Sequence, residues 1–205
     1  MYYLLLSMFL AFMVCGVQAK ADELQIALRR SYAAEAQGKY AEALTSIQDE
    51  LQRDSRNYFL QMRVGYLNMM LGKYDVSLKA YEAADRLESH AVEAAVGALK
   101  AAMMLGNWAA AETWANDVLR TDSFNYVALS RLAYAYFVRK NYPKAVEYYQ
   151  KVLDLYPSDL DMKTGLAWSL FYMGDKQKAE TSFSEVIAVS PDNVSAKQGL
   201  LAAQK

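Results

Sequence analysis

The side chains that most often carry out catalysis or hold metal ions are scarce in this sequence. The 205 residues include one histidine, His90, and one cysteine, Cys15. Zinc sites draw most of their three or four protein ligands from histidine and cysteine, so His90 cannot anchor one, and we expect it to be a loop or capping residue. Carboxylate pairs such as Asp49-Glu50 occur at predicted helix ends and links, where solvated or capping carboxylates are usual.

Sequence motifs for other chemistry are missing as well. There is no glycine-rich phosphate loop, no Gly-x-Ser-x-Gly turn and no histidine placed for a catalytic triad. The 22 basic and 23 acidic residues give a net charge of -1, which supplies no basic stripe for nucleic acid. The hydrophobic fraction of 54% is too high for a disordered chain. We therefore expect a folded protein that is not an enzyme and that uses no cofactor or metal.

The N-terminal segment has the pattern of a secretory signal. Residues 2–17 are apolar at all but two positions, and the first charged residue is Lys20. A small residue, Ala19, precedes Lys20 and suits signal peptidase, so we predict a signal peptide at 1–19 and an exported protein, located in a bacterial periplasm. Because no Lys or Arg precedes the apolar run, an inner-membrane anchor formed by residues 2–17 is the alternative. Cleavage would remove Cys15 and leave a chain suited to an oxidising compartment.

A short phrase recurs through the rest of the chain at intervals of 34 residues. Its five copies are Gly38-Lys39-Tyr40, Gly72-Lys73-Tyr74, Gly106-Asn107-Trp108, Lys140-Asn141-Tyr142 and Gly174-Asp175-Lys176. A small residue follows each copy, at Ala43, Ser77, Ala111, Ala145 and Ala179. The later units end in helix-stopping and capping residues, as in Tyr156-Pro157-Ser158-Asp159.

This pattern resembles the tetratricopeptide repeat, a helix-turn-helix unit of the same length. The resemblance implies an all-α fold, a right-handed superhelical α-solenoid, with a C-terminal capping helix at 194–205. The five repeats would span 24–57, 58–91, 92–125, 126–159 and 160–193. The first repeat departs most, because Arg30 and Ser31 stand where an apolar and a small residue are expected.

Elementary physics supports the same architecture. Each unit has two predicted helices of roughly 12 to 14 residues with apolar positions spaced at three and four, and no unit can bury its apolar face alone. Neighbouring units must therefore stack. Glycine or lysine at each turn permits the left-handed backbone angle between the helices. We expect Lys140 and Lys176, which replace the usual glycine and aromatic residue, to loosen two turns.

The resemblance also implies a binding groove lined by the first helix of each repeat. Residues thirteen, ten, six, three and two before the turn form one helical face, and here that face is rich in aromatic residues and methionine. A contiguous apolar patch usually marks an interaction site, and methionine adapts its shape to varied partners. We predict a protein-binding groove at Tyr32, Phe59, Met62, Tyr66, Met69, Met70, Met103, Met104, Tyr134, Phe137, Trp168, Phe171 and Tyr172.

Two alternatives remain for these positions. The residues six and three before the turn can instead pack on the neighbouring first helix as ordinary core between repeats. Arg29, Arg63 and Arg131 lie beside the groove, where they would either pair with acidic groups or form a solvated helix flank.

Together these features predict an exported, non-catalytic scaffold that binds a protein or peptide segment with apolar side chains, in an envelope or secretion assembly. The alternative is a self-assembling or membrane-anchored structural component of a cell-envelope complex. We expect no nucleic-acid partner, and membrane contact only if the N-terminal segment is not cleaved.

Overall fold

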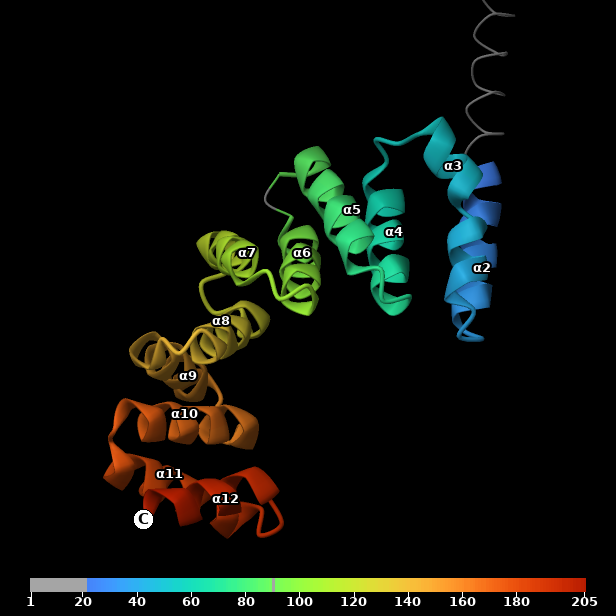
Figure 1. Ribbon diagram of the computed structural model, residues 1–205. Helices are drawn as coiled ribbons and strands as arrows, with labels where there is room; N and C mark the ends of the chain where they lie inside the picture. Colours follow the sequence, from blue (N-terminus) through green and yellow to red (C-terminus); the bar gives the residue numbers. More distant parts are fainter. Residues whose placement is uncertain (1–21, 90) are drawn as a thin grey trace, which may run out of the picture. The chain divides into compact units, whose positions relative to one another are not determined.

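The computed structural model describes residues 22–89 and 91–205, and every regular element in these two ranges is a helix (Figure 1). The predicted all-α fold is confirmed. The predictions for the signal peptide or anchor, Cys15 and His90 lie outside the described residues. No helix within the described ranges combines the length and the apolar run needed to cross a bilayer. The chain divides into two compact units, one ending at Ser89 and the other beginning at His90.

The part of the first unit that the structure describes, residues 22–89, contains five helical segments. Residues 22–35 form the first, and the others are α2 (Tyr40–Thr45), α3 (Gln48–Arg53), α4 (Tyr58–Met70) and α5 (Tyr74–Leu87). The unit's core is an apolar cluster in which the Ala43, Ile47 and Leu67 side chains are completely buried.

The second helix of the first repeat is broken into α2 and α3, whereas the sequence predicted one continuous helix. The Thr45 and Ser46 hydroxyls donate hydrogen bonds to the Ala41 and Glu42 carbonyls, one turn earlier, at 3.0 and 2.9 Å. Such bonds compete with the helical ladder and bend helices. The Ile47 amide then bonds three residues back instead of four, and the helix restarts at Gln48.

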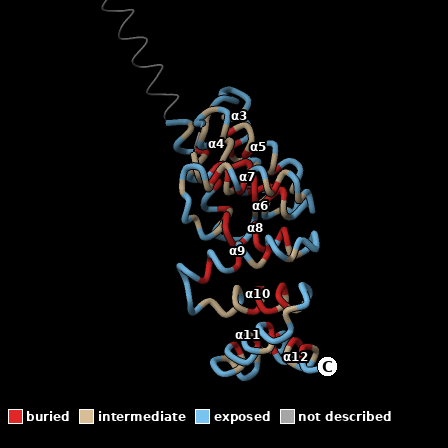
Figure 2. Tube along the Cα trace, turned by 90° about the vertical axis from the view of Figure 1, so that its left-hand side faces the viewer, coloured by how far each residue is buried: buried red, intermediate tan, exposed pale blue. Residues whose placement is uncertain are grey.

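The second unit contains seven helices. They are α6 (Val92–Met104), α7 (Trp108–Thr121), α8 (Tyr126–Val138), α9 (Tyr142–Leu155), α10 (Leu160–Met173), α11 (Lys176–Val189) and α12 (Val194–Ala203). Each helix packs against the next in sequence, and α8 also contacts α6 and α10. Buried and exposed stretches alternate along the helices (Figure 2), because one face of each helix enters the core. This core includes Leu99, Leu132 and Phe183.

The turns between paired helices share one backbone conformation. Gly38, Gly72, Gly106 and Gly174 have φ values of 67 to 97°, and Lys140 takes the same left-handed conformation with φ of 59°. The expectation that Lys140 loosens its turn is wrong. The amides of Lys140 and Asn141 bond to the carbonyls of Phe137 and Tyr136 at 2.9 Å, as the equivalent amides do in the glycine turns. These two bonds hold the lysine backbone in place.

Adjacent helix pairs in the second unit approach closely at two glycines. A Cβ at Gly165 in α10 would lie 2.4 Å from the ring of Tyr149 in α9, and a Cβ at Gly199 in α12 would lie 2.1 Å from the ring of Phe183 in α11. Both rings are buried. The backbone of the following helix thus forms one wall of the site that each ring occupies.

A partly buried hydrogen-bond network joins α7 to the end of α8. The Tyr136 hydroxyl donates to Glu112 at 2.6 Å, and the Arg139 guanidinium donates to the other Glu112 oxygen at 2.7 Å. The hydrogen bond from Tyr136 is the largest of the effects that lower the pKa of Glu112 below its ordinary value of 4.5. Burial and the same bond raise the pKa of Tyr136, so both groups keep their usual charge states near neutrality.

The residues that directly precede α4, α6, α8, α10 and α12 differ in whether their side chains cap the helix. Asn57, Asn125, Asp159 and Asn193 each cap a helix by accepting a hydrogen bond from a backbone amide three residues on. Ala91 precedes α6 with a similar extended backbone but has no side chain to cap with. Helix α6 therefore lacks a stabilising contact that α4, α8, α10 and α12 possess.

We predict that Ala91→Asn stabilises the protein by about 1 kcal/mol, because the new side chain would cap α6. Urea unfolding followed by circular dichroism measures the change. Asn125→Ala is the matched control and should lower the free energy of unfolding by a similar amount. A neutral Ala91→Asn variant alongside a destabilised Asn125→Ala variant would contradict the proposed missing cap.

We also predict that Glu112→Ala lowers the free energy of unfolding by about 1–3 kcal/mol at neutral pH, because the buried Tyr136 hydroxyl loses its acceptor. Since the folded-state pKa of Glu112 is lowered, the stability that its charged form contributes is present above about 4.5 and is lost as the pH falls through the lowered value. The difference in free energy of unfolding between the Glu112→Ala variant and the wild type should therefore become smaller as the pH falls. A gap that is constant with pH would show that the charge of Glu112 contributes nothing.

Candidate functional site

The thirteen residues of the predicted groove all retain exposed surface. Seven are exposed, and they are Tyr32, Phe59, Tyr66, Met70, Met104, Tyr134 and Tyr172. Six are half-buried, and they are Met62, Met69, Met103, Phe137, Trp168 and Phe171. These residues are divided between the two units, and eight of them belong to two surfaces that are described separately. The other five lie outside both surfaces, and they are Met69, Met70, Met103, Met104 and Tyr134.

In the second unit, an aromatic cluster surrounds Tyr172 on α10. We call it the aromatic face, and it consists of Phe137, Tyr142, Trp168, Phe171 and Tyr172. The Tyr172 ring lies nearly parallel to Tyr142 at 5.2 Å and to Trp168 at 5.8 Å, and it contacts Phe137 and Phe171 at 6.0 and 5.3 Å. Tyr172 is nevertheless 51% exposed. Its ring is therefore held in place by its neighbours while still presenting apolar surface to solvent.

The other members of the aromatic face show why some predicted groove residues are half-buried. Phe137, Trp168 and Phe171 pack against the core between repeats, as the alternative reading of these positions expected. Trp168 is further fixed by a hydrogen bond from its indole to the Ser195 hydroxyl at 2.9 Å. Tyr142, which begins α9, was not predicted from the groove spacing because it lies on a second helix.

In the first unit, a cavity of about 300 Å³ lies between the helix at 22–35 and α4. We call it the first-unit cavity. Its lining residues are Leu28, Tyr32, Phe59, Met62, Arg63 and Tyr66. Four of the six were predicted groove residues, so the sequence spacing located this surface.

Arg63 pairs with an acidic residue of its own chain, which is one of the two alternatives that the sequence left open, and it does not form a solvated helix flank. Its side chain is only 6% exposed, and its guanidinium lies 4.0 Å over the Tyr32 ring. Its Nε donates to the buried Ser31 hydroxyl at 3.0 Å, and its Nη1 donates to Glu35. Arg63 therefore belongs to the wall of the first-unit cavity, whereas Arg29 and Arg131 are exposed.

The electrostatics of this wall follow from the same contacts. The hydrogen bond from Arg63 lowers the pKa of Glu35, and the hydrogen bond between Tyr66 and Glu35 raises the pKa of Tyr66. Glu35 is therefore charged at neutral pH and balances the charge of Arg63. One feature of the sequence could have indicated the pair of Arg63 and Glu35. Ser31 is a polar residue at a position that should pack closely, and a buried hydroxyl requires a hydrogen-bond partner.

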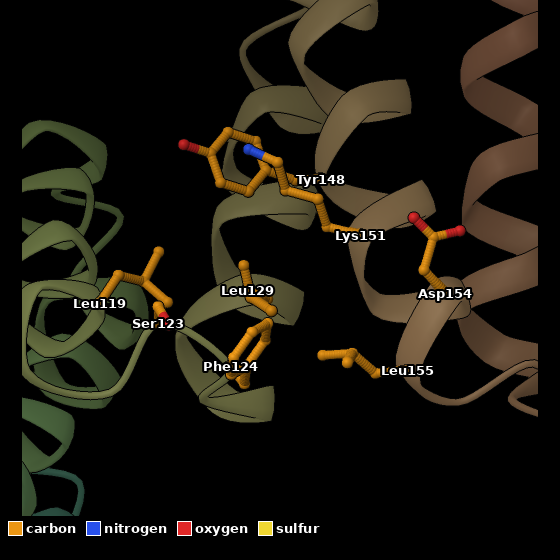
Figure 3. A pocket seen from close by; sticks show the side chains of 8 residues that line it. All are labelled: Leu119, Ser123, Phe124, Leu129, Tyr148, Lys151, Asp154 and Leu155. Carbon is orange, nitrogen blue, oxygen red and sulfur yellow. The ribbon is translucent and has the colours of Figure 1, made fainter.

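A second cavity, of about 310 Å³, lies in the second unit and was not predicted. It is lined by Leu119, Ser123, Phe124, Leu129, Tyr148, Lys151, Asp154 and Leu155. In Figure 3 the Phe124 ring lies between Leu119 and Leu155. Lys151 is engaged by Glu147 at 2.6 Å and by the Tyr148 ring at 4.5 Å. The sequence feature that could have indicated this cavity is Phe124, an aromatic residue in the link before α8. In the structure Phe124 is 67% exposed.

Side chains suited to metal binding do not gather within the described ranges. Neither residues 22–89 nor residues 91–205 contain a group of three or more His, Cys, Asp or Glu side chains that could hold an ion. The aromatic face and the two cavities present apolar and aromatic side chains together with a few hydrogen-bonding groups.

Comparisons with solved structures show the same fold. MamA from Desulfovibrio magneticus has a TM-score of 0.78 and 17% identity, over 84% of this chain and 98% of that one. A tetratricopeptide repeat protein from Parabacteroides merdae has a TM-score of 0.81 and 19% identity, over 89% and 72% of the two chains. YrrB, described as a tetratricopeptide repeat protein with an unusual peptide-binding site, has a TM-score of 0.75 and 14% identity, over 84% and 89%.

Sequence comparisons give the family. Among curated proteins, none matches this sequence. Three family models described as tetratricopeptide repeat match residues 65–126, 126–159 and 165–193, which together make up more than half of the chain. With its 34-residue period and paired helices, the chain belongs to the tetratricopeptide repeat family.

Proposed function

We propose that this protein is a non-catalytic scaffold that binds a protein segment with apolar side chains on the exposed faces of its first helices. The proposal rests mainly on the exposed surface of Tyr172. This residue is 51% exposed although it lies at the centre of the aromatic face. A ring that is already held by its neighbours loses little conformational freedom on binding, which favours association. The similarity of fold to YrrB, whose description includes a peptide-binding site, supports the same class of function.

Simple magnitudes indicate the strength of such binding. If a partner buries four apolar anchors at roughly 1.5–3 kcal/mol each, the gross gain is about 6–12 kcal/mol. Association itself costs on the order of 4–15 kcal/mol. An isolated peptide would therefore bind with weak to moderate affinity, and polar contacts or several contact sites would be needed for a stable complex.

Peptides selected from a random display library against the purified chain provide the test. We expect the selected peptides to be rich in apolar residues. The double variant Tyr134→Ser and Tyr172→Ser should weaken their binding by about 100-fold, because two exposed rings no longer contribute buried area. Circular dichroism should show unchanged helicity, since both side chains lie at the surface.

The control for this test is Phe124→Ser, which removes a more exposed ring at the second cavity. This control should bind the selected peptides as the wild type does. Peptides that bind the double variant normally but lose affinity for the Phe124→Ser variant would refute the assignment to the first helices.

We further propose that the protein is exported by its N-terminal segment and serves an envelope or secretion assembly. The apolar run before Lys20 supports this proposal. The intact mass of the chain recovered from a bacterial host tests it, and we expect a chain that begins at Lys20 or Asp22. A chain that retains residues 2–17 would contradict cleavage and favour the membrane-anchored structural role.

A further inference from the structure

The first-unit cavity contains one polar group whose hydrogen-bonding capacity is not used. Five of its six lining residues are apolar or aromatic, and the sixth is the buried Arg63. Nε and Nη1 of Arg63 donate to Ser31 and Glu35, as described above. Nη2 is closed off from solvent and has no acceptor among the residues that the structure describes.

An unused donor of this kind is unusual. Buried polar groups are almost always hydrogen-bonded, and leaving one without a partner is costly. Because Nη2 is enclosed, bulk water does not supply the missing acceptor. A ligand that occupies the adjacent cavity could supply it.

We propose that the first-unit cavity receives one apolar side chain of a peptide partner, and that the backbone carbonyl beside this side chain accepts a hydrogen bond from Nη2 of Arg63. This inference rests on the proposed function, since it describes one subsite for the same class of partner. The Tyr32 ring lies over the guanidinium and Tyr32 is 57% exposed, so displacing the ring as the carbonyl enters would uncover little buried area.

The charges of the wall favour a neutral acceptor over a carboxylate. Arg63 already forms an ion pair with Glu35, so the site has no excess positive charge to attract an anion. A carboxylate placed at Nη2 would also be repelled by Glu35. The site therefore differs from one that recognises acidic side chains or a chain terminus.

The cavity walls suit an aliphatic or methionine side chain. Phe59 is 73% exposed at the opening and Met62 is half-buried in the wall. Met62 can adjust to the shape of the occupant because its side chain is unbranched and flexible. Its methyl group also provides a spectroscopic probe within the cavity.

The experiment uses the whole chain with isotope-labelled methionine methyl groups and arginine side chains. The two probes are N-acetyl-L-leucinamide, which is neutral, and N-acetyl-L-leucine, which carries a carboxylate. We expect the neutral probe to cause saturable shifts in the methyl signal of Met62 and in the Nη2 signal of Arg63. The methyl signal of Met104, an exposed methionine in the second unit, should not change. The carboxylate probe should bind no more tightly than the neutral one.

Two variants separate the hydrogen bond from apolar burial. Arg63→Lys keeps a positive charge near Glu35 but lacks Nη2, and it should weaken binding of the neutral probe by about tenfold. Phe59→Ser should weaken binding as well, whereas the matched Phe124→Ser variant should bind as the wild type does. Thermal unfolding confirms that each variant is folded. If Arg63→Lys does not fold, the Arg63 Nη2 signal of the wild-type chain decides the question.

Three results would overturn the inference. They are an absence of saturable shifts at Met62, carboxylate binding that is about tenfold tighter than neutral binding, and an Nη2 signal that is unchanged while Met62 responds. None of these results would touch the proposed function, because the peptide test relies on Tyr134 and Tyr172 in the second unit. Loss of that peptide binding would in turn leave the response of Met62 unaffected.

Discussion

The contact between an aromatic ring on one helix and the bare backbone of the helix that follows sets how α10 packs on α9 and how α12 packs on α11. Tyr149 meets Gly165 and Phe183 meets Gly199 at distances that leave no room for a Cβ. A helix pair cannot bury its apolar face alone, so this close approach completes the core. It also fixes the rotation of α10 and of α12 about their own axes, and with it the face of each helix that points outward.

The outward face follows from that rotation. Once Gly165 is placed against Tyr149, the side chains three, six and seven residues further along α10 are placed as well. Trp168 and Phe171 become half-buried supports, and Tyr172 remains exposed between them. The packing that stabilises the unit therefore also holds the rings of the aromatic face in place. Binding residues held on a packed scaffold in this way need little reorganisation.

The regular features of the molecule could be predicted from the sequence because they depend on local spacing. The 34-residue period located the turns, including the left-handed Lys140, and the helical face of exposed residues. The break between α2 and α3 was not predicted, because hydroxyl bonds to helix carbonyls like those of Thr45 and Ser46 also occur in unbroken helices, at Thr113 and Thr181. The burial of Arg63 was missed because Ser31 and Glu35 come from a helix some thirty residues away.

The central claim is that partners bind the exposed face of the first helices. Site-specific photo-crosslinking in living cells tests it most directly, with the photoreactive residue placed at Tyr172 in one strain and at Phe124 in another. We expect a discrete crosslinked protein from Tyr172 and no comparable product from Phe124. A product that forms from Phe124 and not from Tyr172 would contradict it.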